Sequence, residues 1–339
     1  MREASYYTPL EGGAVECGLC PHHCKIAAGK RGICAVRENR QGRLISLVYG
    51  KLAASHIDPI EKKPLFHFLP GSRTYSVATV GCNLSCPFCQ NHDLSLAVRR
   101  MPQPSGFEAR PESVAAEAVA SNCRSLCFTY SEPTIFFEYM LDMARPAREQ
   151  GLKTVIVSNG FIEEEPLKEL GPLLDAANID LKAFSEQTYR RILKASLQPV
   201  LDTIAALCAQ GVWTEVTTLI VPGMNDSEQE LRQIAVFLAS CSRDIPWHVS
   251  RFFPNNEWLD AAPTPSETLR MALEVGREAG LRYIYAGNVP GEFSENTLCP
   301  SCGKAVLERL GFRVLRRRLS AGGRCLECNA EIAGVFSEN

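Results

Sequence analysis

Short runs of β-branched and apolar residues alternate with longer segments of helical character through the middle of the chain. Seven such runs predict buried strands, at 75–80, 126–129, 153–157, 177–181, 213–220, 247–253 and 282–286. Helices are predicted between them, at 111–122, 133–150, 163–174, 186–193, 199–209, 227–240 and 266–279. Proline opens some of these helices, as at Pro111, and glycine follows their ends, as at Gly151. Strict alternation of this kind predicts a parallel sheet with right-handed crossovers.

The number of repeats sets the size of this sheet. Six strand–helix units and one closing strand are fewer than the eight units of a complete barrel, so a barrel built from them stays open on one side. A doubly wound sheet shows the same alternation, and periodicity alone does not separate the two. The cysteine motif described below favours an α/β fold with a partial (β/α)6 barrel over 71–290.

Cysteine-rich segments flank the central region on both sides. The first, 1–70, ends in a proline-interrupted connector and contains four cysteines, Cys17, Cys20, Cys24 and Cys34. The second, 291–339, contains two paired knuckles, Cys299 with Cys302 and Cys325 with Cys328. We therefore expect three parts: an N-terminal four-cysteine module with its connector, the barrel, and a small C-terminal module.

Composition excludes some classes of protein. The chain has 339 residues, 45% of them hydrophobic, and a formal net charge of −2, so it lacks the positive charge of many nucleic-acid-binding proteins. The first residues lack the apolar stretch of a signal peptide, and no apolar run is long enough to span a bilayer. We therefore expect a cytoplasmic protein without a membrane partner. In that reducing compartment, 15 cysteines favour metal or cluster binding over disulfides.

The motif that organises the chain is Cys82-x3-Cys86-x2-Cys89. It follows the first predicted strand, and Gly81 permits a sharp exit from that strand. Three thiolates can hold a cubane iron–sulfur cluster by three of its irons, whereas a cluster that only carries electrons usually has four cysteine ligands. The fourth iron would then stay open. A zinc ion is the alternative, with His92 as its fourth ligand.

The two terminal modules have the ligands of structural metal sites. Four thiols close together favour a structural zinc in the N-terminal module, with an auxiliary iron–sulfur cluster as the alternative. His22 and His23 would be its substitute ligands. The C-terminal knuckles have the spacing of a zinc ribbon, slightly longer than usual. Its arms carry a run of arginines from Arg309 to Arg318, which favours a solvated face over a contact with nucleic acid.

The central motif, with the aromatic Phe88 just before its last cysteine, resembles the signature of the radical SAM superfamily. The resemblance implies a partial barrel in which Cys82, Cys86 and Cys89 hold a [4Fe–4S] cluster. The amino and carboxylate groups of S-adenosylmethionine would chelate the open iron, and reductive cleavage would give a 5′-deoxyadenosyl radical. The backbone at Phe88 would lie near the adenine.

Polar residues at the predicted strand ends could make the remaining contacts with this cofactor, because these ends meet at one face of a barrel. Glu132 would pair with the ammonium group. Lys182, oriented by Asp180, would pair with the carboxylate. The ribose and the adenine would be received by the side chains or backbone of Ser158, Asn159, His248 and Val221.

These positions resemble the pyruvate formate-lyase activating enzymes, in which a Gly-Gly-Glu-Pro motif binds the amino group of the cofactor. This chain has Tyr130-Ser131-Glu132-Pro133. The glutamate is therefore kept, the glycines are replaced, and Ser131 becomes a candidate cofactor contact. The larger side chains crowd the backbone of this motif, so the part that the resemblance carries over to this chain is the role of Glu132.

A closer resemblance, over nearly the whole chain, is to the radical SAM component of the AmmeMemoRadiSam system. It rests on the spacing of the N-terminal cysteines and on the segments 130–134, 221–226 and 288–291. The resemblance implies Memo-like and AMMECR-type proteins as partners. The reductant would be an external flavodoxin or ferredoxin.

Two classes of function remain open at this stage. The first is a radical enzyme that abstracts hydrogen from a substrate, either to place a glycyl radical on a partner protein or to modify a small molecule or another side chain. The second is a redox or docking adaptor that uses its clusters and zinc without radical chemistry. The row of polar residues at the strand ends argues against the adaptor.

Overall fold

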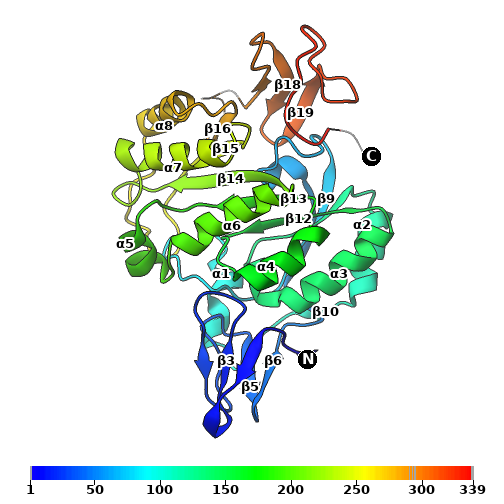
Figure 1. The fold of residues 1–339 in the computed structure, drawn as a ribbon, viewed down its shortest axis with the longest axis vertical. Helices are drawn as coiled ribbons and strands as arrows, with labels where there is room; N and C mark the ends of the chain where they lie inside the picture. The colour runs from blue at the N-terminus through cyan, green and yellow to red at the C-terminus, as the bar shows by residue number, and fades with distance from the viewer. Residues whose placement is uncertain (1, 290, 292, 294, 337–339) are drawn as a thin grey trace.

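The computed structural model describes residues 2–289, 291, 293 and 295–336. Pro290, which belongs to the 288–291 motif, lies outside the described residues. Figure 1 shows three parts along the long axis, with the N-terminal module at one end, the sheet and its helices in the middle, and the C-terminal module at the other end.

An eight-stranded sheet forms the central part, in the order β16-β15-β14-β13-β12-β11-β9-β8. Seven of its strands are parallel to one another. They confirm the seven predicted strands to within a few residues at their ends: β9 (Arg73–Ala78), β11 (Ser125–Phe128), β12 (Lys153–Ser158), β13 (Ala176–Asp180), β14 (Trp213–Ile220), β15 (Trp247–Arg251) and β16 (Ile284–Gly287). The edge strands β16 and β8, both fully described, do not pair with each other, so the fold is the expected partial barrel.

The eighth strand was not expected from the sequence. β8 (Ala54–Pro59) runs antiparallel to β9 along six residue pairs. Its polar residues His56 and Asp58 and its terminal Pro59 are typical of a connector, and this is why no strand was predicted there. Proline is tolerated in an edge strand, where no further strand needs its missing N–H. The segment before the barrel therefore contributes a strand to the barrel sheet.

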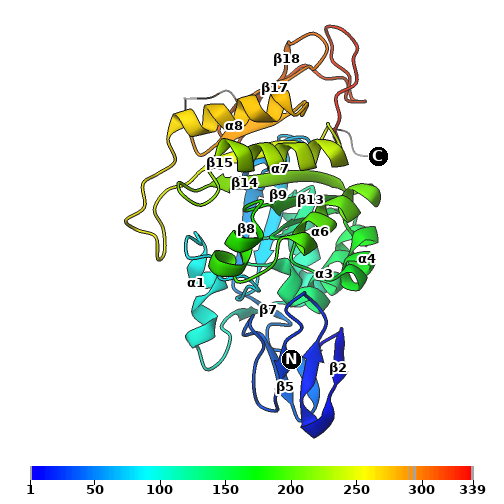
Figure 2. The ribbon, with the colours of Figure 1, turned by 60° about the vertical axis from the view of Figure 1, so that its left-hand side comes forward.

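Helices cover the outer face of the sheet (Figures 1 and 2). Their bounds are α2 (Pro111–Ala120), α3 (Phe137–Glu149), α4 (Glu164–Leu170), α6 (Gln198–Ala209), α7 (Glu228–Cys241) and α8 (Ser266–Glu278). The predicted helix 186–193 is instead one turn, α5 (Glu186–Thr188), continued by the π-helical turn η6 (Tyr189–Leu193). Within the described residues, no single helix is long and apolar enough to cross a bilayer, although the bent pair Glu186–Leu193 and Gln198–Ala209 passes that test when taken together.

Residues 60–69 of the connector close the end of the barrel where the parallel strands begin. Phe68 is fully buried and belongs to one apolar cluster with Cys127, Val155 and Ala176, which lie on β11, β12 and β13. The C-terminal module packs against this closed end of the barrel, because Phe68 forms a β-bridge with Val335. The connector therefore has a packing role.

Small antiparallel sheets build both terminal modules. The N-terminal module contains β2 (Tyr7–Pro9), β3 (Val15–Cys17) and β4 (Lys25–Ile26) in one sheet and β1 (Arg2–Glu3), β6 (Arg43–Ser46) and β5 (Arg37–Arg40) in another. The short pair β7 (Lys51–Leu52) and β10 (Phe107–Glu108) joins it to the barrel. The C-terminal sheet contains β17 (Thr297–Leu298), β18 (Ala305–Leu310) and β19 (Arg313–Arg317).

Arg309 corrects the expectation that the arginine run is wholly solvated. Its guanidinium is buried and donates hydrogen bonds to the Phe66 carbonyl oxygen at 2.6 Å and to Thr297 Oγ1 at 2.8 Å. It also lies 3.9 Å from Glu61. Arg309 therefore anchors the C-terminal module to the connector. Arg316, by contrast, stays on the surface, 3.6 Å from Glu308.

Candidate functional site

The cysteine loop begins at a glycine whose place no other residue can take without moving the backbone. Gly81 has a φ of +111°, and a Cβ there would lie 2.8 Å from Cγ1 of Val36 and 3.1 Å from the carbonyl oxygen of Cys34. Both neighbours belong to the N-terminal module. The exit from β9 is therefore also the point at which this module packs against the barrel.

Arg99 holds the cysteine loop in place. Its guanidinium donates hydrogen bonds to the carbonyl oxygens of Leu84 at 2.6 Å and Cys82 at 3.1 Å. It also donates to Ser85 Oγ at 2.7 Å, and the Ser85 N–H donates to the Leu193 carbonyl oxygen at 3.0 Å. Sequence analysis missed Arg99 because it lies in a stretch without a periodic pattern, and only the tertiary structure brings it to the loop.

Cys82, Cys86 and Cys89 all lie in this loop, but their three sulfur atoms do not all lie within 4.8 Å of one another. Within the described part of the chain, the only group of three or more ligand atoms that all lie within 4.8 Å of one another is in the C-terminal module. A cubane places iron and sulfide between its ligands, so the wider spacing of these three thiols fits a cluster better than a zinc ion. His92 does not complete a zinc site, because its Nδ1 lies 3.3 Å from Asp93.

Two thiols of this loop, those of Cys82 and Cys86, need a bound centre to become thiolates. Burial raises the pKa of Cys82, and it raises the pKa of Cys86 to about 11. Free thiols with such pKa values stay protonated at neutral pH, and a metal centre displaces their protons when it binds. The sulfur ligands, their spacing and their burial are therefore those expected for an iron–sulfur cluster.

Glu132, which follows β11, is buried and accepts three hydrogen bonds. Its Oε1 accepts from the Thr134 N–H at 2.9 Å and from Ser158 Oγ at 2.7 Å, and its Oε2 accepts from the Asn159 N–H at 2.9 Å. Burial raises its pKa in spite of these donors. A carboxylate offers about four acceptor positions, so Oε2 has room for another donor. Ser131 Oγ beside it is buried and has no hydrogen-bond partner among the described residues, and the two groups fit the amino end of a ligand.

Tyr130 keeps the backbone conformation that the replaced glycine would provide. Its φ is +64°, in the left-handed region that costs a non-glycine residue about 1–2 kcal/mol. Its carbonyl oxygen accepts a hydrogen bond from Asn91 Nδ2 at 2.9 Å, and its hydroxyl donates to Asp58. Lys63 Nζ lies 4.1 Å from the centre of its ring. These contacts hold Tyr130 in the strained turn before Glu132.

Ser158 and Asn159 meet Glu132 and the cysteine loop, as the strand-end prediction requires. Asn159 Nδ2 donates to Asn83 Oδ1 at 2.8 Å and lies 3.7 Å from Cys82 Sγ. Asn83 Nδ2 donates in turn to the Phe161 carbonyl oxygen at 2.7 Å. Sequence analysis missed Asn83, although its place directly after Cys82 was the signal that could have identified it.

Asp180 and Lys182 form the predicted ion pair, at 2.9 Å. Burial opposes the positive charge of Lys182, but Asp180 and the nearby Cys86 thiol outweigh it and raise the pKa of the ammonium group. Asn225 ties the neighbouring segment to this pair. Its Nδ2 donates to the Lys182 carbonyl oxygen at 2.7 Å, and its Oδ1 accepts from the Val221 N–H at 2.7 Å. The N–H of Val221 is therefore engaged within the chain, and its contact with adenine stays a prediction.

His248 is not brought to the group around Cys82. It lies inside β15, three residues before the end of the strand, and its Nε2 donates to Glu215 Oε2 at 2.6 Å. The ring stacks on Tyr285 at 5.3 Å and meets Phe66 edge-on at 4.8 Å. The structure thus places His248 in a buried polar cluster nearer the plugged end of the barrel. A ribose contact of His248 stays a prediction.

Phe88 is covered by a loop for which sequence analysis predicted no role. The ring of Trp258, in the segment between β15 and α8, lies 5.3 Å from the ring of Phe88. The Glu257 N–H donates to the Pro87 carbonyl oxygen at 2.9 Å. This segment therefore shields one side of the cysteine loop from water.

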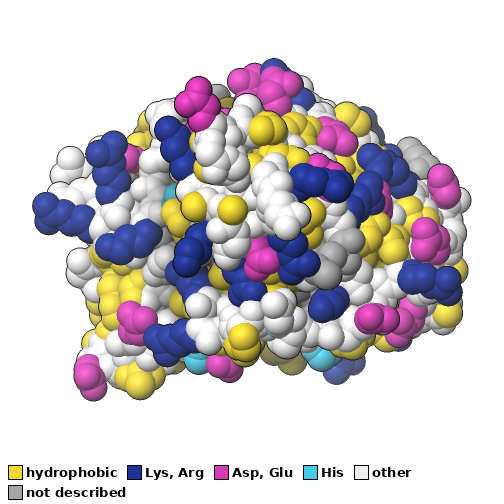
Figure 3. All heavy atoms as spheres, turned by 90° about the horizontal axis from the view of Figure 1, so that it is seen from below, with side chains coloured by type: hydrophobic (Ala, Val, Ile, Leu, Met, Phe, Trp, Pro, Cys, Tyr) yellow, Lys and Arg dark blue, Asp and Glu magenta, His cyan; other side chains and the backbone are white. Residues whose placement is uncertain are grey.

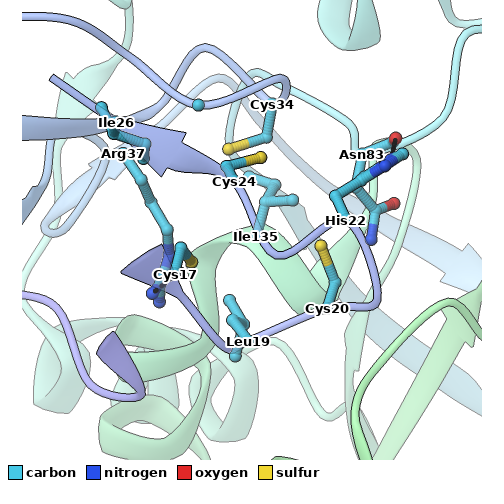
Figure 4. A pocket seen from close by; sticks show the side chains of 11 residues that line it. Cys17, Leu19, Cys20, His22, Cys24, Ile26, Cys34, Arg37, Asn83 and Ile135 are labelled. Atoms are coloured by element: carbon cyan, nitrogen blue, oxygen red, sulfur yellow. Dashed lines mark hydrogen bonds between the residues drawn. The ribbon is translucent and has the colours of Figure 1, made fainter. Parts of the chain in front are cut away.

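The eight cysteines of the terminal modules fall into two different arrangements. Cys299, Cys302, Cys325 and Cys328 lie with all their sulfur atoms within 4.8 Å of one another. In the N-terminal module, Cys17, Cys20, Cys24 and Cys34 instead line one cavity (Figure 4). The structure thus brings each predicted set of four together, and the sets differ in spacing.

Comparisons with known proteins identify the domain that carries this loop. The profile of the radical SAM superfamily matches residues 76–235. An uncharacterised protein of Methanocaldococcus jannaschii is 44% identical over 335 residues, which cover 98% of this chain and 99% of that protein. The pyruvate formate-lyase 1-activating enzyme of Escherichia coli is 21% identical over 165 residues, which cover 46% of this chain and 65% of the enzyme.

Solved structures support the fold. Streptococcus suis SuiB is similar with a TM-score of 0.51 at 13% identity, over 71% of this chain and 55% of SuiB. SuiB bound to S-adenosylmethionine gives a TM-score of 0.50 at 14% identity, over 68% of this chain and 53% of SuiB. The cysteine loop, the partial barrel and the matched profile lead to one conclusion: the chain contains a radical SAM domain and is an enzyme with homology to the pyruvate formate-lyase activating enzymes.

Proposed function

We propose that the chain generates a substrate radical with S-adenosylmethionine at the Cys82–Cys89 loop. When bound there, a [4Fe–4S] cluster supplies the electron that cleaves S-adenosylmethionine to a 5′-deoxyadenosyl radical, which takes hydrogen from the substrate. The observation that carries the proposal is the gathering of three cysteines, Cys86 buried and the other two partly buried, beside Glu132, Asn159 and Lys182.

The chain's own residues would bind and orient the cofactor and keep water out. Glu132 and Ser131 offer an acceptor and a free hydroxyl to an ammonium group, and Lys182 offers a positive charge to a carboxylate. Asn159, hydrogen-bonded to Asn83, would hold the ribose side. Because Glu132 already holds the strand end through three hydrogen bonds, its position is fixed before a ligand arrives.

The test is the formation of 5′-deoxyadenosine by anaerobic protein with dithionite and S-adenosylmethionine. Cys86→Ala should abolish it, because the loop would lose a cluster ligand. Cys241→Ala is the matched control: this half-buried thiol lies at the end of α7, away from the loop, and turnover should stay near that of the unchanged chain. Equal turnover in the Cys86 variant and the control would refute the proposal.

The substrate class proposed is a glycine residue of a partner protein, whose backbone α-carbon would lose hydrogen and carry the radical. The similarity to activating enzymes supports this class, and the Memo-like and AMMECR-type proteins are the partners we propose to test first. A glycyl radical detected by electron paramagnetic resonance on an added partner would support it. Product formed from a small molecule without a partner would favour the small-molecule alternative.

A structural zinc ion is proposed for Cys299, Cys302, Cys325 and Cys328. This module packs under the plugged end of the barrel, away from the cysteine loop, so its metal would stabilise the fold or a docking surface. The adaptor function remains the alternative in which clusters are bound without radical chemistry. A reduced, cluster-loaded protein that forms no 5′-deoxyadenosine would favour the adaptor.

A further inference from the structure

The four N-terminal cysteines surround a cavity that the proposed function does not use. The cavity itself is small, about 20 Å³, and its lining includes Cys17, Cys20, Cys24 and Cys34. Figure 4 shows these side chains arranged around the space in front of Ile135. Ile135 belongs to the barrel, so the cavity lies at the junction of the module and the barrel.

The spacing of the sulfur atoms separates this cavity from the C-terminal site. A tetrahedral zinc ion with bonds of about 2.3 Å to sulfur holds its ligand sulfurs about 3.8 Å apart. In the C-terminal module the Sγ atoms of Cys299 and Cys328 are 3.5 Å apart, and those of Cys302 and Cys325 are 3.8 Å apart, which matches one ion. The four N-terminal sulfurs, all described, do not gather within 4.8 Å. Sulfur atoms spaced more widely than one ion would hold them fit a polynuclear centre, which places iron and sulfide between its ligands.

A buried positive charge faces the same cavity. Arg37 lines it, and its side chain is only 2% exposed. One end of the guanidinium is paired with Glu138, and its Nη1 lies 3.9 Å from Cys17 Sγ. Its Nε is buried and has no hydrogen-bond partner among the described residues. Such a donor fits the sulfur atoms of an anionic cluster, whose potential responds to nearby charge and hydrogen bonds.

Direct contacts link this cavity to the radical site. The carbonyl oxygen of Cys34 packs on Gly81, the residue before Cys82. His22, which lines the cavity, donates from Nε2 to the Asn83 carbonyl oxygen at 2.6 Å. Asn83 lines the cavity as well and is bonded to Asn159 beside Cys82. A centre in the cavity would therefore be the neighbour of the centre at the loop.

We propose that Cys17, Cys20, Cys24 and Cys34 bind a second iron–sulfur cluster, of the [4Fe–4S] type, rather than the zinc ion favoured by the sequence. Four cysteine ligands leave no open iron, so this cluster carries electrons only. It accepts one electron from an external low-potential donor, and the centre at Cys82–Cys89 takes that electron from it. Figure 3 shows the end of the molecule that carries the N-terminal module, where lysine and arginine side chains lie among acidic ones. The electron-transfer role rests on the proposed function, whereas the cluster itself does not.

The decisive measurement is the metal content of the full chain after anaerobic reconstitution with iron, sulfide and zinc. The proposal expects about eight iron and eight sulfide ions and one zinc per chain. About four iron and two zinc per chain would overturn it. This result does not depend on turnover, so failure of the second cluster and failure of the radical chemistry are distinguishable.

A spectroscopic measurement on variants assigns each cluster. A variant with Cys82, Cys86 and Cys89 replaced by alanine should keep about four iron ions and a reduced-cluster resonance that S-adenosylmethionine does not change. The double variant Cys20→Ala, Cys24→Ala should keep the signal that S-adenosylmethionine does change. Loss of all iron from the first variant, with its thermal unfolding still cooperative, would contradict the second cluster.

Discussion

Glu132→Gln tests whether the carboxylate that ends β11 binds the amino group of the cofactor. The substitution keeps the volume of the side chain and removes its negative charge. Glu132 now accepts hydrogen bonds from Thr134, Ser158 and Asn159. The amide NH2 of glutamine would face one of these three donors and could not accept its hydrogen bond. The variant therefore reports on ligand binding and on local stability at once.

The magnitude follows from the contacts that would be lost. A hydrogen bond to a charged group contributes about 1.5–3 kcal/mol, so the affinity for S-adenosylmethionine should fall by about 10- to 150-fold. One buried donor left without an acceptor costs about 1–3 kcal/mol of folding stability. Both effects should appear together.

The assay is a titration of the reduced protein with S-adenosylmethionine, followed by the change in the cluster resonance, beside thermal unfolding. Glu230→Gln is the matched control, because Glu230 Oε1 also accepts a backbone N–H, from Phe184 at 2.7 Å, away from the loop. It should lose stability but keep its affinity. An affinity of Glu132→Gln equal to that of the control would refute the assigned role.

The affinity should also depend on pH. Burial raises the pKa of Glu132 above its ordinary value, so the carboxylate takes up its proton at a higher pH than a free glutamate does. A protonated carboxyl group has lost the charge that attracts an ammonium group. S-adenosylmethionine binding should therefore weaken as pH falls toward this raised pKa, more steeply in the unchanged chain than in Glu132→Gln.

Three further predictions concern stability. Glu138→Ala would leave the buried Arg37 guanidinium without its carboxylate, which should cost about 3–5 kcal/mol in denaturant unfolding, and a cost under 1 kcal/mol would contradict a buried pair. Cys302→Ala should lose the C-terminal metal and lower the melting temperature while the folded fraction still forms 5′-deoxyadenosine; complete loss of turnover in folded protein would contradict its structural role. Burial lowers the pKa of His67 to about 4 from 6.5, so the folded state is more stable above pH 6.5, by roughly 3 kcal/mol, and loses this stability as pH falls toward 4. The free energy of unfolding measured between pH 8 and 4 should show this loss, and the His67→Gln variant should lack it.

The parallel strands and the cysteine sets could be predicted because their signals are local. Each strand is a short apolar run, and the motif at Cys82–Cys89 is contained in eight residues. β8 escaped prediction because pairing with β9, and not its own residues, makes it a strand. The predicted helix 186–193 kept its bounds, but its second part is a π-helical turn, which ends at the left-handed residue Lys194 and which the helical pattern did not indicate.

Side chains that act through long-range contacts could not be predicted. Asn83 becomes part of the site when the loop meets the residue after β12, and Arg99 does so when its segment folds back on the loop. His248 was placed at a strand end by its order in the chain, but Glu215 holds it inside the barrel. The spacing of four sulfur atoms, which separates one ion from a cluster, is a property of the folded module. The cysteine pattern alone therefore left zinc and iron open at Cys17–Cys34.

The most direct test of the central claim uses the Cys20→Ala, Cys24→Ala variant, in which the loop at Cys82–Cys89 holds the remaining iron. Its electron paramagnetic resonance spectrum is recorded after anaerobic reduction, before and after S-adenosylmethionine is added. We predict one reduced cluster signal that shifts on addition and is absent when Cys86→Ala is added to the variant. A signal that S-adenosylmethionine leaves unchanged, or zinc in place of iron at the loop, would contradict the account.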